Sequence, residues 1–212
     1  MPGGDNLHTD RVAHGATHIG SPTKAADRVY RATASVTGTM KTTLCAEQSA
    51  QLYWLPQETI LFDGARLRRS MDVDLHPTAK FLMVEPLVFG REASGETLHL
   101  GALDDRVTIT RDGQPIYLDR IKLHGDIAVS LAGTAVANGA RAVANIVLVD
   151  PSAQTLLDGL RDLLPPNAGA SLLSDTVLVV RILADARYAF RCALLPLLAL
   201  LTNHPVPQNW IP

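Results

Sequence analysis

The sequence places short alternating segments first and helical segments last. Between residues 29 and 123, apolar and polar residues alternate with a period of two in short runs separated by turn residues. This pattern is typical of β-strands that bury one face. The expected strands are 40–47, 51–55, 65–75, 80–89, 97–111 and 115–123. Because helical patterns do not interrupt these strands, the order disfavours a parallel α/β sheet.

The strongest turn signal is the Asp-Gly pair at 112–113, which lies between two alternating runs. Such a pair predicts a tight β-hairpin, because both residues tolerate the left-handed backbone of the turn. On the expected alternation, one face of the hairpin holds the apolar residues Val107, Ile109, Ile116 and Leu118. The other face holds Arg, Thr, Tyr and Asp. We therefore expect a half-solvated antiparallel pair, or one whose polar face meets a partner.

Helical periodicity begins only near residue 150. Asp-Pro-Ser at 150–152 precedes a run with apolar residues at helical spacing, and the run stops at the double proline 165–166. A strand is expected at 176–183 and a last helix at 184–201, which Pro196 should kink or divide. We thus expect a single domain over residues 1–212. Residues 1–149 are β-rich, and residues 150–212 hold two helices and a strand.

Charge and hydropathy exclude several classes of partner. The chain has 19 Lys and Arg against 21 Asp and Glu, so it lacks the basic excess of nucleic-acid-binding proteins. The most apolar run, 192–201, is half of the roughly 20 residues that a spanning helix needs. The N-terminus has no secretory signal pattern. Cys45 and Cys192 lie outside any metal or redox motif. We expect a cytoplasmic protein with reduced thiols and no nucleic-acid or membrane partner.

No enzyme motif is present in the sequence. GxSxG, the P-loop, HExxH and a GxGxxG after a strand are all missing. Paired carboxylates in one pocket would be compatible with a small hydrolase, but no nucleophile or cofactor motif supports that alternative. We expect a protein that is not an enzyme and has no catalytic residue.

Glu85 interrupts FLMVEPLVFG (81–90), which otherwise has the pattern of a fully buried strand. A lone buried carboxylate costs several kcal/mol unless it is paired or hydrogen-bonded. Arg91 is close in sequence and could form a structural ion pair with it. The alternative is a polar lining to an internal channel or metal path. Carboxylate oxygens are hard ligands and suit the transient passage of a transition metal better than its storage.

A second unusual stretch is LYWLPQETILFDGARL (52–67), in which polar corners separate apolar runs. Pro56 ends one strand, Gln57 and Glu58 can satisfy backbone groups, and Asp63 begins a second turn. These polar side chains either brace the fold or line a path. The need for local hydrogen-bond acceptors favours bracing.

Several segments together resemble the urease accessory protein UreD family, called UreH in some systems. They are TKAADRVYRA (23–32), LPQETILFDGARL (55–67), VEPLVFGREASGE (84–96), RDGQPIYLDRIKL (111–123) and VVRILADA (179–186). The order and spacing match across nearly the whole chain. MPGGDNLHTD (1–10) resembles the family's Gly-Gly-Asp segment. Family members carry further strands before that segment, so the resemblance implies that the first strands are missing here. A degenerate or truncated fragment without activity is the alternative.

The resemblance implies a fold and a non-enzymatic role. The fold is mainly β, a layered, β-helix-like array of mostly antiparallel strands with two helices toward the C-terminus. The role is a scaffold that binds the urease apoprotein, UreF and UreG and conducts transient nickel to the urease metallocentre, with no permanently bound cofactor. The implied acidic positions of the nickel path are Asp5, Glu85 and Glu96. The last helix, with Arg187 and Arg191, is the implied partner-facing surface.

Overall fold

The computed structural model describes residues 1, 4–15, 17–22, 26–32, 36–90, 95–202 and 210. The strands are β1 (Asn6–Ala13), β2 (His18–Pro22), β3 (Asp27–Val29), β4 (Gly38–Ala46), β5 (Gln51–Leu55), β6 (Thr59–Leu61), β7 (Arg66–Leu75), β8 (Lys80–Phe89), β9 (Gly101–Arg111), β10 (Gln114–Gly125), β11 (Ala142–Val149), β12 (Ala168–Ser174) and β13 (Val177–Ala184). The helices are α1 (Ile127–Ala132), α2 (Ala153–Leu163) and α3 (Arg187–Thr202).

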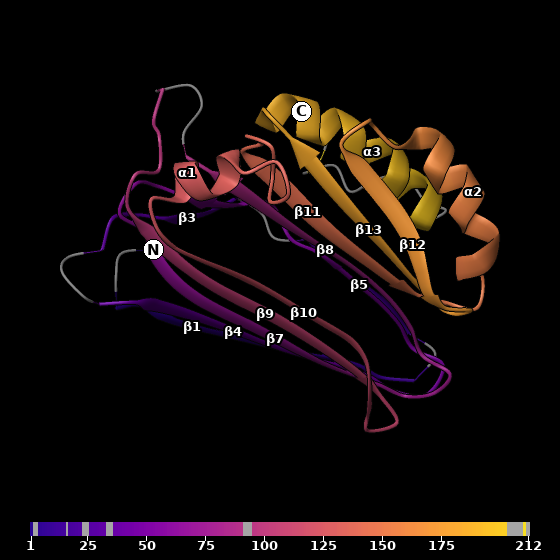
Figure 1. Cartoon of the computed structure of the whole chain (residues 1–212). Helices are drawn as coiled ribbons and strands as arrows, with labels where there is room; N and C mark the ends of the chain where they lie inside the picture. The colour runs from indigo at the N-terminus through magenta and orange to yellow at the C-terminus, as the bar shows by residue number, and fades with distance from the viewer. Residues whose placement is uncertain are drawn as a thin grey trace.

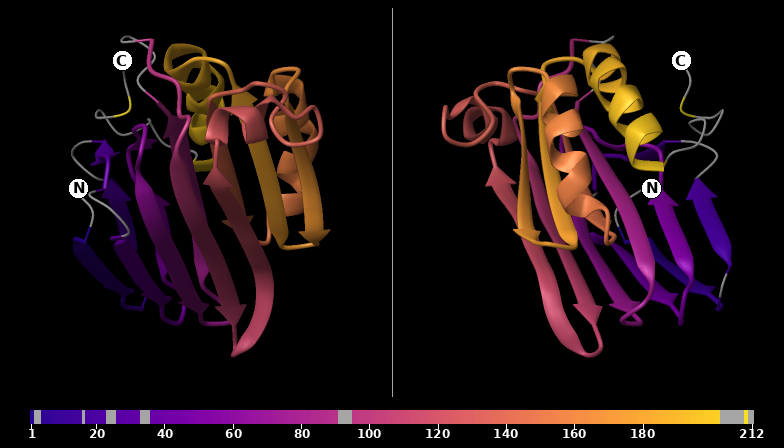
Figure 2. Two further views of the ribbon diagram at one scale, coloured as in Figure 1. Left: turned by 60° about the vertical axis from the view of Figure 1, so that its left-hand side comes forward. Right: turned by 90° about the vertical axis from the view of Figure 1, so that its right-hand side faces the viewer.

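These elements form three layers (Figure 1). The first layer, here called the outer sheet, has the strand order β1-β4-β7-β9-β10. The second, the central sheet, has the order β12-β13-β11-β8-β5-β2, and β6 joins β3 to β8. Helices α2 and α3 pack on the face of the central sheet that points away from the outer sheet (Figures 1 and 2). The mainly β, layered fold expected from the sequence is confirmed.

The direction of pairing differs from the expectation. Among the described strands, seven pairs are parallel and four are antiparallel. The expectation that most strands pair antiparallel was therefore wrong. From β4 to β9 the chain passes back and forth between the two sheets. Each time it returns to a sheet, the new strand therefore lies parallel to the previous one, as β4, β7 and β9 do in the outer sheet. That winding is the β-helix-like feature of the fold.

The β9–β10 hairpin forms as predicted, with positive φ at both Asp112 and Gly113. Its second strand keeps the expected phase at Ile116, which packs against the core between the sheets, but has the opposite phase from Tyr117 onward. The register shifts between Pro115 and Tyr117, and one extra residue sends every following side chain to the other face. Leu118 is consequently 67% exposed. Tyr117 packs instead against the core between the sheets.

The helical region holds more than the sequence indicated. Strand β12 adds a second strand to residues 150–212, and α1 is a further helix that lies before this region, in the part expected to be β-rich. Helix α3 runs through Pro196 without division. None of the helices in the described part of the chain combines the length and the apolar character that crossing a bilayer requires.

Candidate functional site

Four strands each carry one polar residue at the same level inside the sandwich of sheets. These residues are Arg69 on β7, Glu85 on β8, Asp105 on β9 and Asn145 on β11, all less than 9% exposed. In each strand the residues two positions before and after the polar one are apolar and belong to different core clusters. Because side chains two apart in a strand share a face, the four polar residues form a layer that separates the two clusters. We call it the charged layer.

Arg69 is the centre of the charged layer. Its Nε and Nη2 donate to the two oxygens of Asp105 at 2.8 and 2.6 Å. Its Nη1 lies 2.6 Å from Oε2 of Glu85. The other oxygen of Glu85 accepts a 2.6 Å hydrogen bond from the indole nitrogen of Trp54. The fork of one guanidinium thus joins a carboxylate on each sheet, a geometry that suits arginine better than lysine.

Burial and pairing oppose each other in the electrostatics of this layer. Burial raises the pKa of Glu85, and the Arg69 charge and the Trp54 hydrogen bond only partly oppose that effect. For Arg69, burial alone would lower the pKa, but Asp105 and Glu85 outweigh it and keep the guanidinium charged. Two carboxylates therefore share one cation in a site shielded from water. Such a site attracts further positive charge.

The layer continues toward the open edges of both sheets. Asn145 lies directly opposite Glu85 in the β8–β11 pairing. Its amide nitrogen donates to Asp119 of β10 at 2.8 Å, and its oxygen accepts from Arg181 of β13 at 2.7 Å. Arg181 also donates to Asp119 at 2.8 Å, and its side chain is 52% exposed. The layer therefore reaches solvent at this side.

On the opposite side, the layer reaches β6 and β3. Arg69 Nη1 donates to Thr59 of β6 at 3.3 Å. Thr59 in turn lies opposite Asp27 in the β3–β6 pairing. Burial raises the pKa of Asp27, while the Arg69 charge acts in the opposite direction. A chain of polar groups thus crosses the sandwich from Asp27 to Arg181.

The corner at 56–58 does not reverse the chain. Strands β5 and β6, on either side of it, both pair parallel with β8. The corner therefore separates two strands that continue in the same direction along β8, and it lies beside Glu85. Just before it, Trp54 points into the sandwich and bonds Glu85. The last residue of the corner, Glu58, bonds Arg187 and Arg191 of helix α3.

Glu58 forms the second buried ionic cluster, on the helix side of the central sheet. It is 0% exposed and accepts from Nε of Arg191 at 2.6 Å and from Nε of Arg187 at 3.2 Å. Arg191 also donates to the side chain of Gln57. Its guanidinium lies 5.7 Å from the ring centre of Trp210, whose indole donates to the Leu55 carbonyl at 3.2 Å.

This cluster shifts the acidity of Glu58 strongly. Burial alone would raise its pKa, but the hydrogen bonds from Arg191 and Arg187 lower the pKa to about 2. The bracing role expected for Glu58 agrees with these contacts. We expected Arg191 of α3 to face a partner. Its side chain is instead only 11% exposed and pairs with Glu58 inside the fold. Arg187 is 46% exposed.

The three predicted acidic residues lie in three different environments. Glu85 lies in the charged layer. Asp5 is exposed beside the start of β1, where its carbonyl accepts from the Thr39 amide. Glu96 is partly exposed and accepts from the Asp63 amide at 3.3 Å. Arg91, the partner expected for Glu85, lies outside the described residues, and the observed partner is Arg69.

Asp63 also braces the fold. One of its oxygens accepts from the Leu100 amide at 2.9 Å, and the other pairs with Arg31. The contact with Glu96 uses the backbone amide of Asp63 and therefore leaves its carboxylate free for these two bonds. Asp63 thus ties the turn after β6 to the segment before β9.

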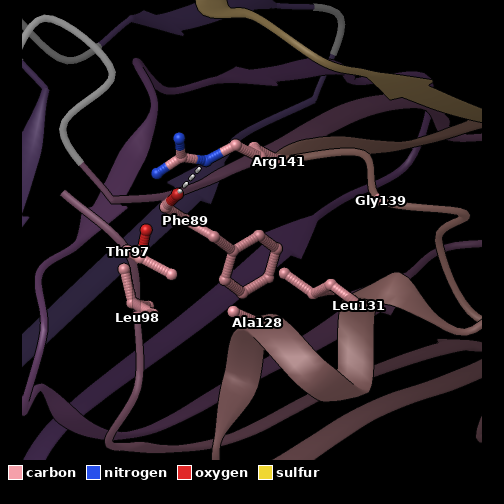
Figure 3. Close-up of a pocket in the computed structure, with 7 residues that line it drawn as sticks. All are labelled: Phe89, Thr97, Leu98, Ala128, Leu131, Gly139 and Arg141. Carbon is pink, nitrogen blue, oxygen red and sulfur yellow. Dashed lines mark hydrogen bonds between the residues drawn. The ribbon is translucent and has the colours of Figure 1, made fainter. Parts of the chain in front are cut away.

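A cavity of about 160 Å³ lies beside α1 and is lined by Phe89, Thr97, Leu98, Ala128, Leu131, Gly139 and Arg141 (Figure 3). Most of the lining is apolar. Arg141 Nε donates to the Phe89 carbonyl at 3.4 Å, and Nη2 donates to the Glu96 carbonyl. The side chain of Arg141 thus anchors backbone, and the cavity shares no lining residue with the charged layer.

The charged layer contains carboxylate, hydroxyl and amide oxygens, which are ligands that hard cations prefer. Within the described residues, no group of three or more His, Cys, Asp or Glu side chains is placed to hold a metal ion. Sequence reasoning identified Glu85 but missed Arg69, Asp105 and Asn145. Asn145 carried the same signal, a single polar residue in the apolar run AVANIVLV.

Comparison with known protein sequences agrees with these motifs. The model of the family described as UreD urease accessory protein matches residues 1–210. A urease accessory protein UreD from Roseobacter denitrificans is 46% identical over 210 residues, which are 99% of this chain and 77% of that protein. The UreD of Ruegeria pomeroyi is 44% identical, covering 99% of this chain and 82% of that protein.

The family match contains all of the motifs that carried the resemblance. The family match begins at the Gly-Gly-Asp segment and runs past the last helix. A third relative, the UreD of Rhizobium rhizogenes, is 39% identical over 99% of this chain and 77% of its own length. The chain belongs to the UreD family of urease accessory proteins, which is a family of accessory proteins and not of enzymes.

Proposed function

We propose that this protein is a urease maturation scaffold in the cytoplasm that binds the urease apoprotein, UreF and UreG and conducts nickel toward the urease metallocentre. Nickel is transient cargo in this proposal, and no cofactor is bound permanently. The observation that carries the proposal is the charged layer, which crosses an otherwise apolar core from Asp27 to Arg181.

The energetics of the layer support a role beyond stability. Removing Arg69 and two carboxylates from water costs several kcal/mol per ion, and apolar residues of similar size often serve a core as well or better. The two flanking clusters show that these strands can pack apolar side chains on both sides of the layer. A role in carrying cations gives a reason for the buried charges that packing alone does not.

Arg69 has a specific part in this proposal. Its guanidinium pairs with both Glu85 and Asp105 in the resting chain and balances one of their two charges. An incoming divalent cation competes with Arg69 for the same oxygens. Both carboxylates then hold the cation only transiently, because Arg69 recovers them when the cation leaves. Asp5 and Glu96 remain predicted positions of the path outside the charged layer.

The test is the nickel content of urease matured with variants of the layer. Glu85→Gln and Asp105→Asn each remove one negative charge and keep the side-chain shape. We expect the nickel bound per urease active site to fall by roughly tenfold, the scale on which altered ligand surroundings weaken metal binding. Metal analysis of urease, purified after co-expression of the complete set of maturation proteins, measures this quantity.

The matched control is Asp158→Asn, because Asp158 lies on α2 with a side chain that is 96% exposed. It should leave nickel content unchanged. All three variants should still co-purify with the urease apoprotein and UreF. Full nickel occupancy with both layer variants, in an intact complex, would remove the charged layer from the path. Failure of the unaltered chain to join any complex would contradict the scaffold role itself.

A further inference from the structure

The open face of the outer sheet has a strongly uneven charge distribution. Side chains on this face come from alternate residues of β4, β7, β9 and β10, because register partners in neighbouring strands point to the same side. The half of the face nearest α1 carries six formal cations and one carboxylate: Lys41, Arg66, Arg68, Arg106, Arg120, Lys122 and Asp104. We call this half the basic half. The whole chain has a net charge of −2, so the excess is local.

The other half of the same face is acidic. Asp72 and Asp74 of β7 lie there, and Asp10 of β1 lies in the row of Asp72 through its partner Thr43. Leu118, which is 67% exposed, lies in the same row as Asp72, because both are register partners of Thr108. The face is thus divided into a basic and an acidic half, and the exposed leucine lies in the acidic row that borders the basic half.

Arg106 and Arg120 place two like charges next to each other in the basic half. They are direct register partners in the β9–β10 pair, and like charges directly opposite each other destabilise a sheet. Each has a carboxylate neighbour in another row: Arg120 bonds Asp104 at 2.9 Å, and Arg106 lies 3.4 Å from Asp72. Both side chains are nevertheless 56% exposed.

A pocket of about 230 Å³ lies at the end of the basic half. Its lining includes Arg31, Arg66 and His124, together with backbone at Gly101 and Gly125. The Nε atom of Arg66 is buried and has no hydrogen-bond partner among the described residues. A buried donor without a partner is costly, and it belongs to a residue that lines this pocket.

Helices α2 and α3 lie on the far side of the molecule, against the central sheet (Figure 2). The open face presents its strands side by side across a broad, gently twisted surface (Figure 2). This shape fits a protein surface better than a nucleic-acid backbone, because a strand of phosphates that follows the face would run onto its acidic half.

We propose that the open face of the outer sheet docks an acidic protein surface, with a carboxylate side chain of the partner in the Arg31–Arg66–His124 pocket and an apolar contact on Leu118. The inference rests on the proposed function, because the partner is sought among the urease apoprotein, UreF and UreG. It deepens that function by assigning the surface and the charge of the partner. Electrostatic complementarity of this kind sets specificity and the rate of association.

The test is binding of the full chain to each of these three proteins, measured at low and at physiological salt. Arg106→Glu should weaken binding to one partner by about tenfold at low salt and reduce the salt dependence. The same change places an acid opposite Arg120, so the free chain should fold at least as well. If Arg106 served only the stability of the fold, a variant that folds normally would bind the partner as well as the unaltered chain does.

The control is Arg161→Glu, a charge reversal of equal size at a 52% exposed position on α2, which should leave binding unchanged. If the chain binds a partner and Arg106→Glu has no effect, the docking face is wrong and the scaffold role stands. If the unaltered chain binds none of the three, both proposals fail. Two other losses caused by Arg106→Glu would overturn the acidic-protein partner: loss of binding to a double-stranded DNA probe, or loss of self-association in sedimentation.

Discussion

Replacing Glu58 with leucine is expected to lower the free energy of unfolding by roughly 3–5 kcal/mol, the cost of breaking a buried ion pair. The side chain of Glu58 is fully buried, and its loss leaves the guanidinium of Arg191 in the core without its carboxylate. Arg187 can turn to solvent because it is already 46% exposed. Urea unfolding followed by tryptophan fluorescence measures the change, since Trp210 lies against Arg191.

The double variant Glu58→Leu/Arg191→Met separates the charge effect from the loss of packing. It removes both members of the pair, so much of the lost stability should return. Glu47→Leu is the control, because Glu47 has a side chain that is 49% exposed. A single Glu58→Leu variant as stable as the unaltered chain would show that the corner at 56–58 does not depend on α3.

The pH dependence of the same pair has a definite sign. The pKa of Glu58 is lowered from 4.5 to about 2 in the folded chain, so the folded state favours the ionised form. The resulting stability, about 2–3 kcal/mol after allowance for the exposed Arg187, is fully present above pH 4.5. It is lost as the pH falls from about 4.5 toward 2. The stability difference between the unaltered chain and Glu58→Leu should therefore shrink across this range.

The second large effect is expected in the charged layer. Arg69→Met alone leaves Glu85 and Asp105 buried without their shared cation, and we expect a loss of roughly 3–5 kcal/mol. The triple variant Arg69→Met/Glu85→Met/Asp105→Leu should recover most of that loss, because apolar residues can replace a buried ionic group. Urea unfolding of both variants measures the two effects on one scale.

The triple variant also distinguishes stability from function. If the charged layer carries nickel, the triple variant should fold and join the urease complex, yet urease matured with it should contain little nickel. A triple variant that is stable and also supports full nickel loading would show that the layer is only a structural ionic cluster. The Asp158→Asn control applies here as well, because it alters an exposed charge on α2.

Much of the strand arrangement follows from local pattern. The strands 51–55 and 80–89, the hairpin at Asp112-Gly113 and the helix after residue 152 lie where alternation, turn residues and helical spacing predict them. The phase of β10 after Ile116 was predicted wrongly because a single bulge near Pro115 inverts the alternation of the rest of the strand. Strand direction was predicted wrongly because periodicity within a strand carries no information about the direction of its neighbour.

The candidate site was only partly predictable for a related reason. Glu85 and Asn145 interrupt apolar runs and can be recognised one at a time. Arg69 and Asp105 lie in strands that alternate with charged outward residues, such as Arg68 and Asp104, so nothing local shows that they point inward. Their shared level depends on the register of four strands from two sheets.

The sequence by itself determined the family, the β-rich first part, the later helices and the requirement that Glu85 find a partner. All of these depend on local pattern or on a burial cost carried by one residue. Only the tertiary structure decided that this partner is Arg69 rather than a neighbour in sequence, and that Glu58 is bound by α3. Both pairings join residues on separate elements. Ion pairs of this kind depend on how the layers stack, and the stacking is decided by the packing of the whole chain.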